Sequence, residues 1–151
     1  MGKRLLLLNG PNLNMLGQRE PETYGSTTLK DVVEMVKEVC DQHGYELESF
    51  QSNHEGDLVD RLQRANKEAA GIIFNPAAYT HTSIALRDAI AAIEPPVVEV
   101  HISNVHKREE FRQHSMLAAV CLSQIVGFGV DGYWLAAMGL IQKIESEGRN
   151  L

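Results

Sequence analysis

The sequence predicts an α/β fold in which a parallel five-stranded sheet carries helices on both faces. Short apolar runs typical of buried strands alternate along the chain with segments whose apolar residues recur at helical spacing. Strands separated by helices pair in parallel through right-handed crossovers. No linker, repeat or low-complexity tract interrupts this alternation, so we expect one domain over residues 1–151.

The first half of the chain supplies three strands and two helices. Residues 5–8 are four consecutive leucines, as expected for a strand buried on both faces. Apolar residues recur at helical spacing from residue 29 to residue 40, and Gly44 stands where that helix would end. Residues 45–51 alternate like a strand, residues 58–69 form an amphipathic helix, and residues 72–74 form the third strand.

The second half supplies the remaining elements. A helix runs from about residue 83 to residue 93 and is ended by Pro95 and Pro96. The fourth strand covers residues 97–102, the fifth lies within residues 120–128, and Asp131 can cap a last helix. For five such units the common order is 2-1-3-4-5, the flavodoxin-like arrangement, whose ligands bind at the carboxyl ends of the strands near the switch in strand order.

Composition limits the partners of the protein. The hydrophobic fraction of 44% and the charged fraction of 23% are ordinary for a globular protein, and the net charge of -6 opposes nonspecific binding to nucleic acid or anionic membranes. No apolar run approaches a membrane span, and the leucine run is too short for a signal peptide, so we expect a cytoplasmic protein. Cys40 and Cys121 are expected to be reduced core thiols.

The longest polar segment, residues 9–25, follows the first strand directly. Connections in compact domains usually take about 4–6 residues, so a loop of this length is either disordered or functional. Leu13, Met15 and Leu16 provide apolar anchors that disordered segments lack, and Gly17 and Gly25 stand where a lid would hinge. We therefore expect an ordered lid over the ends of strands 3 and 4.

Glu99 and His101 lie two residues apart in the fourth strand, so their side chains face the same side of the sheet. A carboxylate beside an imidazole orients it and favours its protonated form, which prepares a general acid. The alternative is an edge-strand pair that faces water. Ser103 and the backbone after it can offer N–H groups to an anion at the strand end.

Two arginine arrangements also have two interpretations. Arg19 shares the lid with Tyr24, where a guanidinium would lower the pKa of the phenol; the alternative is a packing tyrosine and a solvated arginine. Arg108 and Arg112 share a face if their segment is helical, and either can bind a carboxylate. The glutamates between them also permit an ordinary surface ion-pair network.

Three residues near strand ends are either structural or functional. Asn12 and Asn75 each lie beside a proline, where asparagine is common in turns. His81 caps or begins the third helix, or binds a ligand. The histidines show no HExxH spacing, no dinucleotide or P-loop motif follows the first strand, and no GxSxG occurs, which disfavours metal, nucleotide and serine-nucleophile chemistry.

Taken in order, these segments closely resemble the signature of type II 3-dehydroquinate dehydratases. The resemblance rests on residues 8–14, on Leu16, Gly17, Arg19, Pro21, Tyr24 and Gly25, and on residues 75–81, 99–104, 108–112 and 127–129. It spans almost the whole chain. The differences that stand out are Gln113 and residues 117–124, which we assign to a connection and the core rather than to catalytic positions.

The resemblance implies a flavodoxin-like fold and the reversible, cofactor-free anti dehydration of 3-dehydroquinate to 3-dehydroshikimate through an enolate. This reaction serves aromatic amino acid biosynthesis, in the shikimate pathway, or quinate catabolism. Tyr24, as a phenolate held by Arg19, would remove a C2 proton, and Asn12 would position a water on the enolate. His101, oriented by Glu99, would protonate the leaving C1 hydroxyl.

The same resemblance implies a substrate-binding set. The substrate carboxylate would lie against the backbone of Ile102 and Ser103. The ring hydroxyls would be held by Asn75, His81 and Arg112. Arg108 is a candidate for supporting the lid or the site.

Asp88 lies several residues into the third helix, well away from its own strand end at 1.5 Å per residue. The resemblance implies that this aspartate completes the site of a neighbouring subunit. It therefore implies a homo-oligomer, specifically a dodecamer of four trimers.

The rival class is a noncatalytic binding or signalling module, because flavodoxin-like sheets also serve as flavin carriers and receiver domains. A receiver should carry acidic residues after the first strand, where this chain has residues 9–12 with the sequence Asn-Gly-Pro-Asn. A flavin carrier would copurify yellow.

Overall fold

Five parallel strands form one sheet in the order β2-β1-β3-β4-β5, as the sequence predicts. The computed structural model describes residues 3–18, 22 and 25–149 of the chain. The strands are β1 (Arg4–Asn9), β2 (Glu46–Gln51), β3 (Gly71–Asn75), β4 (Val97–His101) and β5 (Ser123–Val126). β1, β3 and β4 are therefore neighbours, and their carboxyl ends meet at one edge of the sheet.

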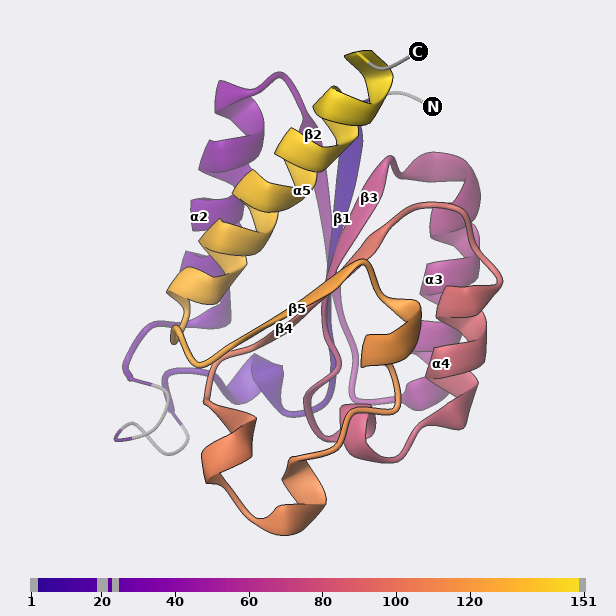
Figure 1. Ribbon diagram of the computed structural model, residues 1–151. Coiled ribbons are helices and arrows are strands. Elements are labelled where there is room, and N and C mark those ends of the chain that lie inside the picture. Colours follow the sequence, from indigo (N-terminus) through magenta and orange to yellow (C-terminus); the bar gives the residue numbers. More distant parts are fainter. Residues whose placement is uncertain (1–2, 19–21, 23–24, 150–151) are drawn as a thin grey trace.

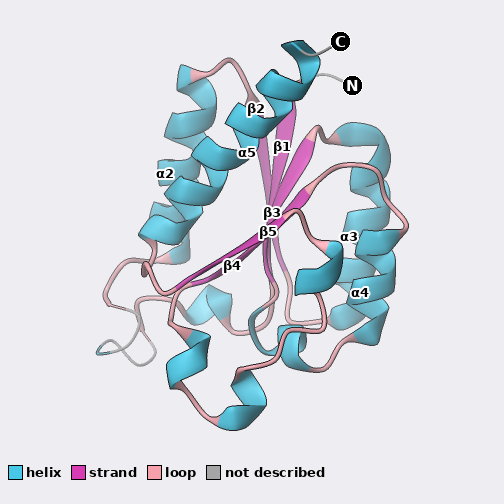
Figure 2. Ribbon diagram, viewed as in Figure 1, coloured by secondary structure: helices cyan, strands magenta, loops and turns pink. Residues whose placement is uncertain are grey.

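Helices cover both faces of the sheet (Figure 1; Figure 2). On one face lie α2 (Leu29–Gln42) and α5 (Asp131–Arg149), and on the other lie α3 (Glu55–Glu68) and α4 (Ile84–Ala91). Within the described residues, no helix is both long and apolar enough to cross a membrane.

Local sequence explains where the helices begin and end. The Thr28 hydroxyl accepts a hydrogen bond from the backbone N–H of Asp31, whose carboxylate accepts one from the Thr28 N–H, so a capping box starts α2. Gly44 follows α2 with φ of 76°, a conformation that favours glycine. Ser83 caps α4 by accepting from the Leu86 N–H. His81, one of the candidates for that cap, lies instead in a 3-10 turn, η2 (Ala77–His81).

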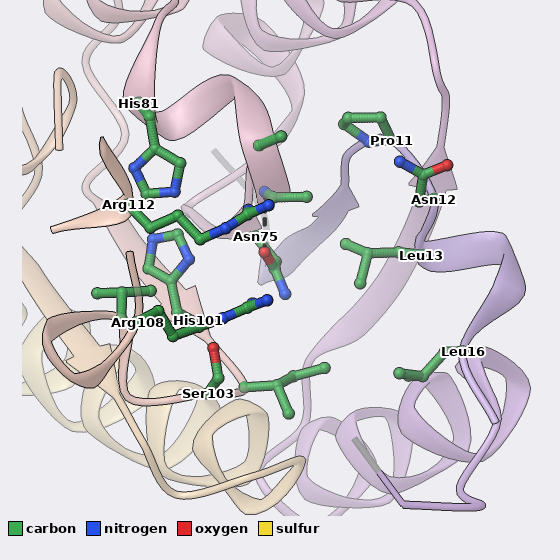
Figure 3. A pocket seen from close by; sticks show the side chains of 14 residues that line it. Pro11, Asn12, Leu13, Leu16, Asn75, His81, His101, Ser103, Arg108 and Arg112 are labelled. Atoms are coloured by element: carbon green, nitrogen blue, oxygen red, sulfur yellow. Dashed lines mark hydrogen bonds between the residues drawn. The ribbon is translucent and has the colours of Figure 1, made fainter. Parts of the chain in front are cut away.

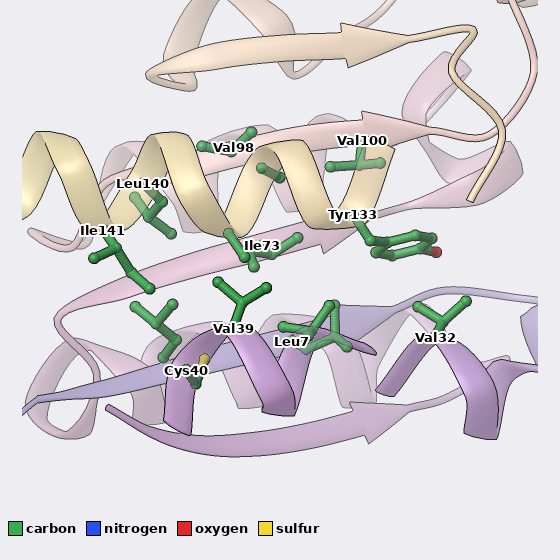
Figure 4. Close-up of a cluster of buried hydrophobic side chains, with 14 of the residues drawn as sticks. Leu7, Val32, Val39, Cys40, Ile73, Val98, Val100, Tyr133, Leu140 and Ile141 are labelled. Carbon is green, nitrogen blue, oxygen red and sulfur yellow. The ribbon is translucent and has the colours of Figure 1, made fainter. Parts of the chain in front are cut away.

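The leucines of β1 alternate between two separate cores because successive side chains point to opposite faces of a strand. Leu5 and Leu7 join the core under α2 and α5, whereas Leu6 and Leu8 join the core under α3 and α4. Figure 4 shows the first core, with Leu7, Val32, Val39, Cys40, Ile73, Val98, Val100, Tyr133, Leu140 and Ile141. Four buried leucines in one strand thereby hold both helical layers on the sheet.

A close approach at Gly10 joins the segments that follow β1 and β3. The Gly10 N–H donates to the carbonyl of Asn75 at 2.8 Å. A Cβ at this position would lie 2.5 Å from the carbonyl oxygen of Pro76, which is part of the backbone. Only glycine allows this contact, and it places the two polar segments side by side.

Candidate active site

A pocket opens at the carboxyl ends of β1, β3 and β4, where the topology places a ligand site (Figure 3). Its volume of about 190 Å³ exceeds the cavity of about 150 Å³ that holds benzene. The pocket can therefore enclose a substituted six-membered ring. Its lining comprises Pro11, Asn12, Leu13, Leu16, Asn75, Ala77, Ala78, His81, His101, Ile102, Ser103, Val105, Arg108 and Arg112.

Glu99 and His101 form a buried pair in one wall of the pocket. β4 lies between β3 and β5, so the edge-strand alternative for this pair is wrong. Glu99 is 0% exposed and His101 is 5% exposed, and the Nε2 of His101 lies 2.5 Å from Oε2 of Glu99. Because a carboxylate only accepts hydrogen bonds, the proton belongs on Nε2, and Nδ1 is the ring nitrogen that Glu99 leaves to a ligand.

Glu99 stays ionised although it is buried. Burial alone would raise its pKa, but the hydrogen bond and charge of His101, together with hydrogen bonds from Gln124 and Thr80, hold the pKa below its ordinary value. The Thr80 hydroxyl donates to Oε2 at 2.8 Å, and the Ser115 hydroxyl lies 2.9 Å from Oε1 and 3.0 Å from Oε2. The pair thus places an ionised carboxylate beside an imidazole at neutral pH.

Asn75 is held in one orientation by a buried chain of hydrogen bonds. Its Oδ1 accepts from the Ala77 N–H at 3.0 Å, and its Nδ2 donates to the Tyr133 hydroxyl at 2.8 Å. That hydroxyl donates in turn to Oδ1 of Asn9 at 2.7 Å. Burial raises the pKa of Tyr133 above its ordinary value, so the phenol remains a donor. The second Nδ2–H of Asn75 is left to serve a ligand oxygen.

Two pocket residues adopt left-handed backbone conformations that non-glycine residues seldom use. Asn12 has φ of 70° and Ala77 has φ of 54°. The Asn12 N–H donates to Oδ1 of Asn53 at 2.9 Å, and the Ala77 N–H is the donor to Asn75. Such conformations cost of order 1–3 kcal/mol and concentrate at functional sites. Both positions are turns in the pocket lining, so the prediction of Asn12 as a turn residue is confirmed, and its role toward a ligand stays a prediction.

His81 presents a neutral ring to the pocket. Its Nδ1 lies 2.8 Å from the carbonyl oxygen of His114, which fixes the proton on Nδ1 and leaves Nε2 as an acceptor. Burial lowers the pKa of His81, and the nearby charges of His101 and Arg112 lower it further. The rings of His81 and His101 lie 6.4 Å apart between centroids. A ligand hydroxyl can therefore donate to His81 and stay within reach of His101.

Arg108 and Arg112 bring positive charge to the pocket, although their segment is not an α-helix. The segment forms only a 3-10 turn, η4 (Glu110–Arg112). Arg108, before this turn, and Arg112, at its end, both line the pocket. Glu109 lies between them, 3.8 Å from Nε of Arg108 and 3.2 Å from Nε of Arg112. The predicted ion-pair network and the predicted ligand-facing position therefore coexist.

The remaining predicted site residues fall in three places. Ile102 and Ser103 follow β4 and line the pocket, whereas Asp88 lies exposed on α4 and does not. Arg19 and Tyr24 lie outside the described residues. Leu13 and Leu16 of the predicted lid are buried against the core under α2, so the described start of this segment is ordered.

Sequence reasoning missed the residues that hydrogen-bond to Glu99 and to the side-chain amide of Asn75. Thr80, Ser115 and Gln124 reach Glu99 from three separate segments, and Tyr133 reaches Asn75 from α5. Gln124 belongs to the stretch assigned above to a connection and the core; it lies in β5, and its side chain contacts Glu99. The sequence carries no signal for these contacts because each depends on register or packing between distant elements.

Known proteins are similar to this chain in sequence and fold. A family model described as dehydroquinase class II matches residues 3–141. A 3-dehydroquinate dehydratase of Anoxybacillus flavithermus is 55% identical over 146 residues, which cover 97% of this chain and 99% of that protein. A catabolic 3-dehydroquinase of Penicillium rubens is 56% identical over 136 residues, which cover 90% of this chain and 88% of that protein.

A solved structure agrees with the sequence matches. The crystal structure of type II dehydroquinase from Propionibacterium acnes has a TM-score of 0.89 to this chain at 40% identity. The match covers 94% of this chain and 98% of that one.

Proposed function

Because the chain belongs to the class II dehydroquinase family, we propose that it catalyses the reversible anti dehydration of 3-dehydroquinate to 3-dehydroshikimate. It is a hydro-lyase whose reaction passes through an enolate. The observation that carries the assignment to this pocket is the buried Glu99–His101 pair in its wall. In this proposal the chain is a single flavodoxin-like catalytic domain over residues 1–151.

Tyr24 is the proposed base. Its phenolate takes the C2 proton beside the ketone, and Arg19 stabilises both the phenolate and the developing negative charge. Lowering the pKa of a phenol from about 10 to about 7 requires about 4 kcal/mol of preferential stabilisation of the anion. Asn12 holds a water that donates to the enolate oxygen. Its position in the pocket lining supports this role.

His101 is the proposed acid. The imidazolium gives its Nδ1 proton to the C1 hydroxyl as the C1–O bond breaks, and the hydroxyl leaves as water with the bonding electron pair. The hydrogen bond from Nε2 to Glu99 supports this role because it fixes the orientation of the ring and leaves Nδ1 to the substrate. His101 then takes up a proton from solvent, and Tyr24 releases one.

Binding uses both the charge and the hydrogen-bond polarity of the lining. The substrate carboxylate lies against the backbone N–H groups of Ile102 and Ser103. Asn75 donates from Nδ2 to one ring hydroxyl, and the neutral His81 accepts from another. Arg112 holds a further hydroxyl, with Arg108 supporting the lid. In a protein of net charge -6, these two arginines are the local attraction for an anionic substrate.

The site extends between subunits in this proposal. Asp88 lies exposed on α4, outside its own pocket lining, which supports a role in a neighbour's site. The assembly is a homododecamer of four trimers, and the enzyme is cytoplasmic, without nucleic-acid or membrane partners.

The activity is tested by adding 3-dehydroquinate and following the ultraviolet absorbance of the conjugated enone product. We expect the absorbance to rise without any added cofactor. A folded, oligomeric preparation that gives no absorbance change would refute the proposed function.

The base is tested with Tyr24→Phe. We expect the variant to keep its folding stability and its affinity for 3-dehydroquinate, measured by calorimetry, while turnover is lost. Activity close to that of the unmodified protein would mean that another group removes the proton.

A further inference from the structure

Gln124 lies directly opposite Glu99 on the neighbouring strand. The register of β4 and β5 pairs these two residues, so their side chains project to the same face of the sheet. Nε2 of Gln124 lies 3.0 Å from Oε2 of Glu99. A carboxylate oxygen only accepts, so this contact is a donation from the amide N–H. Gln124 itself does not line the pocket.

Oε2 of Glu99 is the oxygen that also accepts from His101. The other neutral donors to this carboxylate, Thr80 and Ser115, carry hydroxyl groups that can rotate. Ser115 is moreover tied to its own loop, because its Oγ accepts from the N–H groups of Leu117 and Ala118. Gln124 differs from both, because strand register places it opposite Glu99 and its amide offers this oxygen an N–H.

We propose that Gln124 is a positioning residue for the acid step, because its N–H keeps Glu99 anionic and thereby keeps the shared proton on His101. The inference rests on the function proposed above. Without this donor, Glu99 competes better for the proton of His101, and less imidazolium is available to protonate the leaving hydroxyl. The direction of the Glu99 pKa, lowered in part by Gln124, agrees with this role.

The test separates the acid step from the base step. Enolate formation by the base exchanges the C2 proton of 3-dehydroquinate with solvent and does not require the acid. Gln124→Met keeps the length of the side chain but has no donor. We expect kcat to fall about tenfold, KM to change less than about twofold, and exchange in deuterated water to rise relative to dehydration.

Two further variants serve as controls for Gln124→Met. Gln142→Met makes the same change at an exposed position on α5 and should leave kcat and the exchange ratio unchanged. Gln124→Asn shortens the side chain by one methylene, so its amide no longer reaches Glu99. This variant should change kcat and the exchange ratio in the same direction as Gln124→Met, and it replaces Gln124→Met if that variant folds poorly. Unchanged kcat in a folded Gln124 variant, or equal loss of exchange and dehydration, would overturn the inference. Inactivity of the unmodified chain would instead refute the proposed function.

A measurement without substrate tests the same idea. The ring ¹⁵N shifts of His101 report where its proton lies. We expect Gln124→Met to move the Nε2 proton toward Glu99, and identical shifts in the variant and the unmodified chain would contradict the proposed role.

Discussion

We expect the hydroxyl of Tyr133 to contribute both to folding stability and to substrate binding. Tyr133→Phe removes one oxygen from a side chain that is 0% exposed and leaves the ring in the core. Two hydrogen bonds disappear, the one from Nδ2 of Asn75 at 2.8 Å and the one to Oδ1 of Asn9 at 2.7 Å. Both amides are buried, so no bulk water replaces the hydroxyl.

The magnitude follows from the groups left without partners. A neutral hydrogen bond contributes about 1 kcal/mol, and a buried polar group left unsatisfied costs about 1–3 kcal/mol. We therefore expect Tyr133→Phe to lower the free energy of unfolding by about 2–4 kcal/mol. Asn75 also loses the contact that fixes its amide, so we expect KM for 3-dehydroquinate to rise about tenfold, a loss of about 1.4 kcal/mol of binding.

Urea denaturation gives the first quantity and steady-state kinetics the second. Tyr79→Phe is the matched control because its hydroxyl makes one bond, to the backbone oxygen of Asn53 at 2.8 Å, in an exposed place. It should cost less than about 1 kcal/mol, since water can replace the hydroxyl. Equal stability losses in the two variants, or an unchanged KM in Tyr133→Phe, would refute the reasoning.

Three further outcomes test the pair and the backbone. Glu99→Gln should lower the free energy of unfolding, and the difference from the unmodified chain should have its full size above the ordinary carboxyl pKa of 4.5. The difference should shrink as pH falls through the lower pKa of folded Glu99, because protonated Glu99 resembles glutamine. A difference that grows in acid would contradict this. Gly10→Ala should lower the urea midpoint strongly, because its Cβ would lie 2.5 Å from a backbone oxygen. Gly139→Ala, in a helix with open space around the new Cβ, should instead stabilise by about 0.5–1 kcal/mol, as the same assay can verify.

Much of the fold was predictable because its signals are local. The leucine run of β1 and the glycine after α2 mark their elements through side-chain period and backbone preference, which neighbouring residues set. The alternation of strands and helices then restricts the strand order to a few choices. Element boundaries moved by a few residues, as in β5, where the predicted range was wider than Ser123–Val126.

The site was predictable where its residues are close in sequence. Glu99 and His101 were identified by their spacing on one strand, and the loop after β4 was placed by topology. The segment around Arg112 was less accessible to sequence reasoning. Whether this segment forms an α-helix or a 3-10 turn depends on what it packs against, and in the folded protein it forms a 3-10 turn.

The sequence by itself determined the strand-helix alternation, the polar strand ends and the Glu99–His101 pair, because each depends on residues that are neighbours along the chain. Only the tertiary structure decided that Gln124 donates to Glu99 and that Tyr133 orients Asn75. These contacts join residues 25 and 58 positions apart, and each requires strand register or helix packing to bring polar atoms within 3.0 Å. These short distances form only when the complete fold excludes water from the interior, because a buried polar group without a partner is costly there.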